Sequence, residues 1–244
     1  MFRKHVRISK IFLAPAIFYV STGALAQTFE TPNETVTGEE LVVVCKFCHG
    51  SSLQGSIRRD GPALAGLPAW YLEQQMRNFI DGVRGTHPED VPGHQMHFST
   101  GMLRNDYTLS SVAEYISGLE PGIPMTADAI VERPYVWESR YAGLEPGITG
   151  NPETGQQTYL SICLACHGPD GASNEALGAA SLVYLSEQYL ARQLKYFRDG
   201  IRGTHPRDIR GAQMAAMSKS LTTDQAIADV VAYIIRLRPD SGGQ

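Results

Sequence analysis

All four cysteines of the chain stand in two pentapeptides that share one pattern of cysteines and histidine. These are Cys45-Lys46-Phe47-Cys48-His49 and Cys163-Leu164-Ala165-Cys166-His167. In Cys-x-x-Cys-His, two thiols one helical turn apart bond to the porphyrin vinyl groups, and the histidine ligates the iron. The two motifs therefore predict two covalently bound haem c groups, attached through Cys45 and Cys48 and through Cys163 and Cys166. His49 and His167 are the predicted iron ligands.

Other cysteine chemistry explains the pattern less well. Four cysteines in two Cys-x-x-Cys pairs could bind one structural zinc ion, but the histidine after each pair would then have no role. A thioredoxin-like redox pair belongs in a strand–helix context, which neither flank supplies. Disulfides would also leave both histidines unexplained.

The repeat continues beyond the motifs at the constant offset of 118 that separates Cys45 from Cys163. Residues 81–88, Asp-Gly-Val-Arg-Gly-Thr-His-Pro, match residues 199–206, and no gap is needed as far as the closing prolines. A fixed period of this kind indicates duplicated structural units. We expect haem domains at 27–121 and 153–244, joined by a Pro/Gly-rich linker at 122–152. In domains this small, a covalently held porphyrin would complete the apolar core.

Apolar periodicity predicts helices throughout both copies. Segments 39–47 and 156–165 are expected to lead into the haem motifs, and 70–80 and 188–197 to form a second pair. The last helix of each copy has the clearest pattern, and Thr222 with Gln225 is a candidate capping box in the second copy. No alternating strand pattern occurs, so we expect an all-α fold of two tandem domains.

The first 26 residues have the features of a secretory signal. Four basic residues (Arg3, Lys4, Arg7 and Lys10) precede an apolar run at 11–20, and Ala24-Leu25-Ala26 ends the segment. Cleavage would start the mature chain at Gln27 and deliver it to the periplasm. The alternative is a retained membrane anchor, although the run is short for a spanning helix and contains Pro15.

The charge of the chain excludes one class of partner. The formal net charge is −4, and removal of the signal's four basic residues would make it −8. An acidic protein has no electrostatic basis for binding nucleic acid. The charge suits either steering towards a basic patch on a redox partner or solubility alone. In the linker, Tyr135, Trp137 and Tyr141 predict that it packs on the domain surfaces.

The second axial ligand decides the chemistry of each iron. Met96 and Met214 are the only methionines that match at the repeat offset, each in a Gly-x-Gln-Met segment that we expect to be a loop. Methionine ligation raises the potential and suits electron transfer. Core packing is the ordinary role of a methionine and is the alternative here. Rival ligands are the matched His87 and His205, His94 and His97 beside Met96, and Met217 in the second copy.

Two further matched pairs are candidates for contacts with the porphyrin. Arg84 and Arg202 suit recognition of the haem propionates, or are exposed loop charges. Tyr71 and Tyr189 are expected to pack beside the haem, or within an ordinary core.

Both motifs continue as Cys-x-x-Cys-His-Gly, through Gly50 and Gly168. Further family features are Gly61-Pro62-Ala63-Leu64-Ala65-Gly66, Tyr71-Leu72-x-x-Gln75 and Tyr189-Leu190-x-x-Gln193. In these respects the chain resembles the dihaem class I c-type cytochromes of the cytochrome c4 family. The resemblance implies two fused cytochrome c domains with His/Met ligation. It also implies periplasmic electron transport, with cbb3-type oxidases as frequent acceptors.

The resemblance gives Pro62 a role that the second copy fills differently. In the family, a proline carbonyl accepts a hydrogen bond from the proximal histidine. Pro62 fits this role for His49, whereas the second copy has Ala180, which keeps a carbonyl but lacks the fixed φ of proline. We expect the two haems to differ in potential for this reason, and the unmatched His94 and His97 add to the asymmetry.

The favoured function is a periplasmic electron carrier, not an enzyme, that passes single electrons from respiratory-chain donors to a terminal oxidase or reductase. Peripheral association with the membrane would accompany such partners. A second hypothesis is the cytochrome subunit of a periplasmic dehydrogenase that oxidises sulfide or alcohol. A third is a dihaem peroxidase or thiosulfate-oxidising enzyme, which requires an open or unusually ligated iron.

Overall fold

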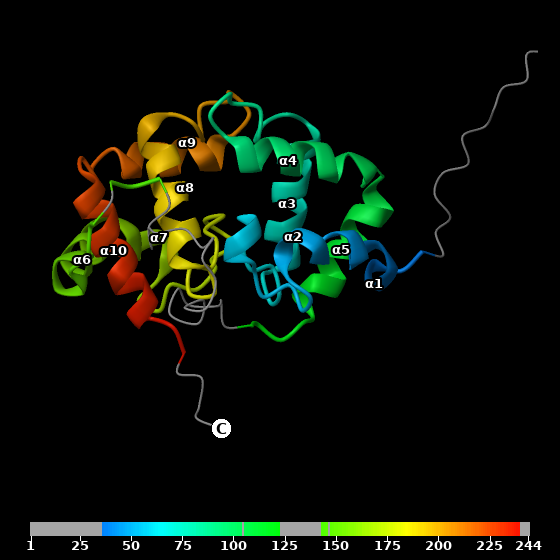
Figure 1. The fold of residues 1–244 in the computed structure, drawn as a ribbon, viewed down its shortest axis with the longest axis horizontal. Coiled ribbons are helices and arrows are strands. Elements are labelled where there is room, and N and C mark those ends of the chain that lie inside the picture. Colours follow the sequence, from blue (N-terminus) through cyan, green and yellow to red (C-terminus); the bar gives the residue numbers. More distant parts are fainter. Residues whose placement is uncertain (1–35, 104, 123–142, 146, 240–244) are drawn as a thin grey trace, which may run out of the picture. The chain divides into compact units, whose positions relative to one another are not determined.

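The computed structural model describes residues 36–103, 105–122, 143–145 and 147–239. The predicted signal, the linker aromatics Tyr135, Trp137 and Tyr141, and the outer ends of the two predicted domains at 27 and 244 lie outside these ranges. Every described secondary-structure element is helical (Figure 1), apart from two isolated bridges, Ser56 with Gly61 and Asn174 with Ala179. The prediction of an all-α fold is confirmed.

Two groups of helices repeat one arrangement along the chain. In the first half, α1 and α3 pack against α5, and α3 also contacts α4; in the second half, α6 and α8 pack against α10, and α8 contacts α9. The first group comprises α1 (Gly38–Leu41), η1 (Val42–Val44), α2 (Lys46–His49), η2 (Ile57–Arg59), α3 (Ala69–Ile80), α4 (Val91–Ser99), η3 (Thr100–Met102) and α5 (Asp106–Ser117). The second comprises α6 (Pro152–Thr158), η5 (Tyr159–Cys163), α7 (Leu164–His167), α8 (Glu187–Asp199), α9 (Ile209–Ser218) and α10 (Asp224–Arg236).

The helices that enter the two Cys-x-x-Cys-His motifs differ by one residue. A Cβ on Gly38 would lie 2.0 Å from the Ser111 carbonyl oxygen of α5, and one on Gly155 would lie 1.9 Å from the Asp229 carbonyl oxygen of α10. These two helix crossings are therefore equivalent. Cys45 is seven residues beyond its crossing glycine and Cys163 is eight. The first half spans the distance with the tight 3₁₀ turn η1, and the second with the π-helical turn η5, which absorbs one extra residue.

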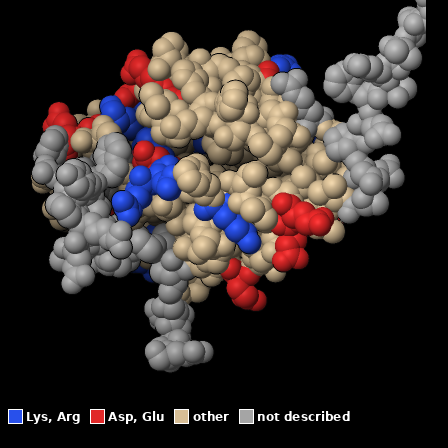
Figure 2. Space-filling model, turned by 45° about the vertical axis from the view of Figure 1, so that its right-hand side comes forward, with Lys and Arg blue, Asp and Glu red and all other residues tan. Residues whose placement is uncertain are grey.

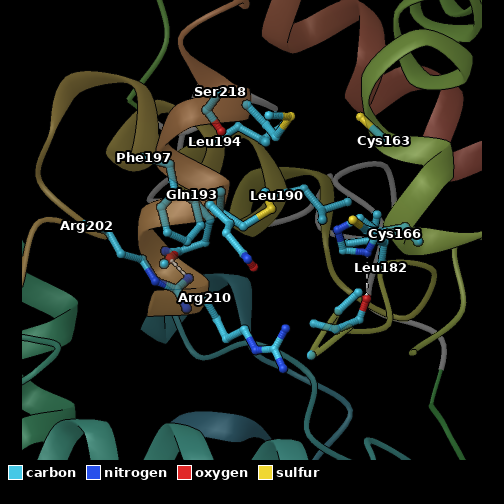
Figure 3. A pocket seen from close by; sticks show the side chains of 18 of the residues that line it. Cys163, Cys166, Leu182, Leu190, Gln193, Leu194, Phe197, Arg202, Arg210 and Ser218 are labelled. Atoms are coloured by element: carbon cyan, nitrogen blue, oxygen red, sulfur yellow. Dashed lines mark hydrogen bonds between the residues drawn. The ribbon is translucent and has the colours of Figure 1, made fainter. Parts of the chain in front are cut away.

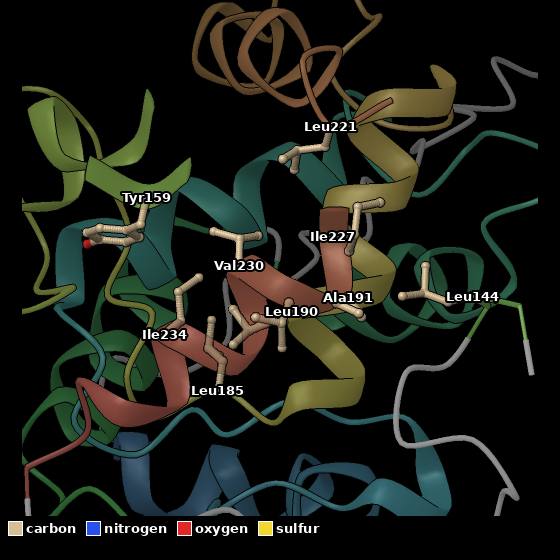
Figure 4. Close-up of a cluster of buried hydrophobic side chains, with 11 residues drawn as sticks. Leu144, Tyr159, Leu185, Leu190, Ala191, Leu221, Ile227, Val230 and Ile234 are labelled. Carbon is tan, nitrogen blue, oxygen red and sulfur yellow. The ribbon is translucent and has the colours of Figure 1, made fainter. Parts of the chain in front are cut away.

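Each half has its own apolar core around its last helix. The core of the second half (Figure 4) also includes Leu144, which precedes α6, so the described end of the predicted linker packs on that half. A buried leucine of this kind contributes about 1.5–3 kcal/mol to stability. The buried residues of the first core are Val42, Leu53, Ala65, Leu67, Leu72, Met76, Leu103, Leu109, Val112, Ala113 and Ile116.

Helix starts correct two details of the sequence-based prediction. α10 is capped by Thr223, whose side chain accepts from the Ala226 amide; Thr222 is not its cap. Gln225, the expected partner in a capping box, instead donates to the Thr149 carbonyl and to Asp229. The capping side chain must belong to the residue with extended backbone, and Thr223 has it.

Among the described residues, no helix has both the length and the apolar character needed to cross a membrane.

Candidate haem sites

Two cavities, one in each half, are lined by the residues predicted to bind haem. Cys45, Cys48, His49 and Met96 line the first cavity, and Cys163, Cys166, His167 and Met214 line the second. Figure 3 shows the second cavity, with Cys163 and Cys166 on one side and Leu194, Phe197 and Arg202 across from them. The walls of both are otherwise mainly apolar, which suits a porphyrin ring.

Both motif histidines are buried and share one hydrogen-bond geometry. His49 is 4% exposed and its Nδ1 lies 2.8 Å from the Pro62 carbonyl oxygen. His167 is 7% exposed and its Nδ1 lies 2.9 Å from the Ala180 carbonyl oxygen. A carbonyl can only accept, so Nδ1 carries the proton and Nε2 keeps the lone pair that a metal needs. Alanine at position 180 thus preserves the contact that proline makes in the first half.

Burial tunes the protonation of the motif side chains. It lowers the pKa of His49 and His167, against the opposing effect of the carbonyl each contacts, and so favours the neutral imidazole that ligates metals. Burial raises the pKa of the Cys45 thiol, and raises that of Cys163 to about 11. The four cysteines form no disulfide.

Met96 and Met214 lie on helices, which corrects the expectation of loops. Met96 belongs to α4 and Met214 to α9. Each helix is started by a buried aspartate: Asp90 accepts from the Gly93 amide at 2.9 Å, and Asp208 accepts from the Gly211 amide at 2.8 Å. The Asp-x-x-Gly spacing is a helix-start signal that the sequence contains and the prediction missed. The glycine in Gly-x-Gln-Met marks the first turn of a helix.

The glycines at 93 and 211 also explain part of the repeated motif at 81–88. Gly85 and Gly203 have φ of 79° and 81°, and a Cβ on either would lie 2.3 Å from the carbonyl oxygen of Gly93 or Gly211. The repeated loops therefore approach the methionine-bearing helices closely, which only glycine permits.

The rival histidines lie elsewhere. His87 and His205 line neither cavity, and their Nδ1 atoms accept from the Glu89 and Arg207 amides at 3.2 and 3.1 Å. These are local turns of the kind that a loop histidine makes. His94 and His97 also line neither cavity, and His97 Nδ1 contacts the Phe79 carbonyl. Other methionines do line the cavities: Met76 and Met102 in the first, and Met217 in the second.

Arg84 and Arg202 belong to a cluster that joins the two halves. We call this the arginine cluster; it comprises Tyr71, Gln75 and Arg84 with their matches Tyr189, Gln193 and Arg202. Arg84 donates to Gln75 Oε1 at 2.7 Å and across to Tyr189 and Gln193, both at 3.1 Å. Arg202 donates to Gln193 Oε1 at 2.5 Å and across to Gln75 Oε1 at 3.0 Å. The tyrosines and glutamines line both cavities.

The arginine cluster has more positive charge than its own residues neutralise. No described carboxylate forms an ion pair with either guanidinium, and the Nε atoms of Arg84 and Arg202 are buried without a partner. Burial, and then the charge of Arg84, lower the pKa of Arg202. Burial alone would raise the pKa of Tyr189, but Arg84 and Arg202 beside it lower that pKa. Donors without acceptors at the edge of both cavities fit a group that brings carboxylates, as haem does.

Comparison with known proteins agrees with this geometry. Residues 150–234 match the family model for cytochrome c oxidase, cbb3-type, subunit III. The chain is 30% identical to cytochrome c4 of Azotobacter vinelandii over 69% of its own length and 74% of that protein. The chain belongs to the cytochrome c4 family. As a cytochrome c4, it carries two covalent haem c groups and acts as an electron carrier.

Two further relatives frame the function and the fold. A protein of Thiomonas intermedia named thiosulfate dehydrogenase electron acceptor is 29% identical to this cytochrome c4 over 77% of each chain. The crystal structure of reduced recombinant cytochrome c4 from Pseudomonas stutzeri matches with a TM-score of 0.56 at 23% identity. That match covers 81% of this chain and 95% of the other, and it supports the fold of two tandem class I cytochrome c domains.

Proposed function

We propose that the chain is a periplasmic electron carrier in which His49 and Met96 ligate one haem iron and His167 and Met214 the other. Cys45, Cys48, Cys163 and Cys166 form the thioether attachments. The observation that carries this proposal is that each cavity brings together one complete set of two cysteines, a buried histidine and a matched methionine. Haem iron supplies the one-electron chemistry, and a methionine sulfur favours the ferrous state.

The protein side chains keep this chemistry to electron transfer. The histidine Nδ1–H bonds to the Pro62 and Ala180 carbonyls fix each ring and its tautomer. Met96 of α4 and Met214 of α9 would each supply the second protein ligand of one iron and exclude external ligands. With no open position on either iron, the chain would not be an enzyme, because peroxide or thiosulfate chemistry requires a site for substrate.

Arg84 and Arg202 are proposed to hold haem propionates. The support is the uncompensated, buried positive charge of the arginine cluster, whose Nε–H groups have no acceptor. Tyr71 and Tyr189 would pack beside the porphyrins, since each lines both cavities. Because the cluster borders both cavities, an electron could pass between the haems without leaving the protein. The Pro62/Ala180 difference supports unequal potentials at the two haems.

Exposed apolar side chains at each cavity rim support exchange of electrons with protein partners. Val44 and Met102 line the first cavity and are 54% and 58% exposed. Leu177 and Met217 line the second cavity and are also exposed. One face of the molecule has a broad uncharged area with charged groups towards its margins (Figure 2). Exposed apolar side chains that gather at one place mark sites of protein or membrane contact, and we propose redox proteins as the partners that bind here.

We propose respiratory donors and a terminal oxidase, such as a cbb3-type enzyme, as the partners, with peripheral association at the membrane. The specific alternative is service to a periplasmic dehydrogenase, which the relative named thiosulfate dehydrogenase electron acceptor supports. Sulfide- and alcohol-oxidising enzymes are further candidate donors. Rapid-mixing experiments compare the rate at which purified thiosulfate dehydrogenase reduces the protein with the rate for a quinol-oxidising respiratory complex. The faster donor distinguishes between the two proposed partners.

Export supports the attachment chemistry and is part of the proposal. Residues 1–26 would be removed, leaving domains at 27–121 and 153–244 with the linker at 122–152. Mass spectrometry of the protein from a periplasmic extract should give a mature chain that starts at Gln27 with two haems. A chain that retains residue 1, found in the membrane fraction, would instead indicate an anchor.

Carbon monoxide tests the ligand assignment and the absence of enzymatic activity together. The reduced protein should not bind carbon monoxide at neutral pH, because methionine occupies both irons. Stoichiometric binding at one haem would overturn the proposal and favour the dihaem enzyme.

A further inference from the structure

The wall of the first cavity includes a buried arginine from the opposite half. Arg192 of α8 donates to Asp60 Oδ1 at 2.7 Å and to the Asp60 carbonyl oxygen at 3.1 Å. Gln188 of the same helix donates to Asp60 Oδ1 at 3.2 Å. The side chain of Arg192 is 8% exposed and that of Asp60 is 23% exposed. Both Arg192 and Asp60 line the first cavity, so this contact belongs to the predicted site of the first haem.

Asp60 belongs to the loop that carries the acceptor for His49. It follows the short helix η2, has a left-handed backbone with φ of 56°, and lies two residues before Pro62. Backbone bonds between Ser56 and Gly61 close the loop. A non-glycine residue in this conformation needs support from its surroundings. Arg192 supplies that support, because it donates hydrogen bonds to both the carboxylate and the carbonyl oxygen of Asp60.

The second half holds the equivalent loop by another route. The residues that match Asp60 and Arg192 are Gly178 and Gln74, which cannot form an ion pair. Arg210 of α9 instead donates to the Leu177 carbonyl, and its guanidinium lies against Gly178. The loop before Ala180 is therefore held by an arginine of its own half. The loop before Pro62 is held by an arginine of the other half.

We propose that Arg192 is a positioning residue for the first haem, supplied by the second domain. It holds the Pro62 loop against His49 and neutralises the Asp60 carboxylate at the edge of the first cavity. The potential of the first haem then depends on a contact between the two domains. The potential of the second haem depends instead on Arg210, which belongs to the same domain as that haem. This inference rests on the proposed ligation of the first haem by His49.

The charges of the pair give the expected direction of each change. Arg192→Gln leaves the Asp60 carboxylate without its cation, which favours ferric iron and lowers the potential of the first haem. Asp60→Asn leaves the cation unpaired and raises it. At an effective dielectric of about 20, a unit charge roughly 10 Å from any one-electron redox centre changes the reduction equilibrium of that centre on the order of tenfold. For a one-electron couple that is a shift of about 59 mV.

The chain offers a matched control for loss of a contact between the halves. Arg207 grips Asp81 in the same manner, with one nitrogen 3.2 Å from the carboxylate and another 3.0 Å from the carbonyl oxygen. This pair also crosses between the halves, but both side chains are more than half exposed and neither lines either of the two haem cavities. Arg207→Gln should move neither potential. Arg210→Gln should lower only the potential of the second haem.

Spectroelectrochemical titration of the purified dihaem protein tests the inference. The two reduction steps are assigned with Met96→His, which should lower only the potential of the first haem. We expect Arg192→Gln to lower the first potential alone, Asp60→Asn to raise it, and the double variant to lie between them. Arg192→Lys, which keeps the charge and loses the fork, should fall between wild type and Arg192→Gln. If Arg192→Gln does not fold, Asp60→Asn tests the inference instead. This substitution is expected to disturb the fold less, because the Asp60 side chain is partly exposed.

The outcomes separate this inference from the proposed function. Equal shifts at both haems, no shift at either, or the same response from Arg207→Gln would overturn the role of Arg192. Wild-type protein that lacks two methionine-ligated haems would instead contradict the proposed function. The methionine-to-iron charge-transfer band, recorded for every variant, makes that distinction.

Discussion

The two halves of this cytochrome c4 share their proposed haem-binding residues at one offset but support them differently. In the first half, a 3₁₀ turn leads into the motif, and the Pro62 carbonyl accepts from the motif histidine. The loop that carries Pro62 is held by Arg192 of the second half. The second enters through a π-helical turn, uses Ala180 and holds its loop with its own Arg210. The duplicated halves therefore keep the proposed haem ligands and attachment cysteines at one offset, whereas the residues that support them differ.

Loss of one haem should have the largest effect, and it tests whether each half depends on its own porphyrin. Cys163→Ser with Cys166→Ser should leave the second cavity without a covalently held porphyrin. The apolar side chains that line the cavity would then lose their packing partner, and this half should become less stable. Limited proteolysis should cut within 153–239 while the first half stays resistant. Cys45→Ser with Cys48→Ser is the matched variant for the first half. Equal resistance of both halves in either variant would show that the cores are complete without haem.

Exchange of the distal ligand should have the next largest effect. Met96→His and Met214→His each replace a ligand that raises the potential with one that lowers it. Each variant should lower one potential and leave the other within the range of wild type. Redox titration measures both. If Met217→His lowers the second potential as Met214→His does, the assignment of the ligand on α9 is wrong.

Replacement of Pro62 should have a smaller effect. This position differs between the halves, because the second half has Ala180 there. Pro62→Ala makes the first loop resemble the second and frees its backbone in the unfolded state, which costs about 0.4–1 kcal/mol. The gap between the two potentials should narrow. Chemical denaturation with a redox titration measures both effects. A gap that stays unchanged would remove position 62 as a source of the asymmetry.

Helix capping should have the smallest effect on the haems, because loss of a cap changes stability and leaves both potentials in place, and the loss of stability should be equal in both halves. Asn105 caps α5 through the Thr108 amide, and its match Thr223 caps α10 through the Ala226 amide. Asn105→Ala and Thr223→Ala should each cost about 1 kcal/mol of unfolding free energy. Thr222→Ala, which removes the residue beside the cap, should cost little. Thermal unfolding followed by circular dichroism measures the three variants.

Much of the fold could be predicted because the repeat and the apolar periodicity are local signals. The helices around Trp70, Gln188, Leu109 and Ile227 lie where the pattern indicates. The helical context of Met96 and Met214 was missed because glycine and proline near a helix start look like loop residues, and the capping role of Asp90 and Asp208 depends on burial. The choice between Thr222 and Thr223 depends on one backbone conformation.

The contacts between the halves could not be predicted from the sequence. Arg84 and Arg202 were found because they match, but their crossed bonds to Gln193 and Gln75 depend on how the domains pack. Arg192 has no matched partner and stands on a helix among other polar residues, so no sequence signal marks it. Long-range pairs of this kind are set by tertiary packing, which periodicity does not encode.

Ligation of each haem iron by one histidine and one methionine is the proposal on which the other predictions depend. The methionine-to-iron charge-transfer band of the ferric protein tests it most directly, with its intensity measured against total haem. Ligation by Met96 and Met214 predicts the intensity of two methionine-ligated haems per chain, which should fall by half in Met96→His and by half in Met214→His. A band that corresponds to one haem or none in the wild-type protein would contradict it.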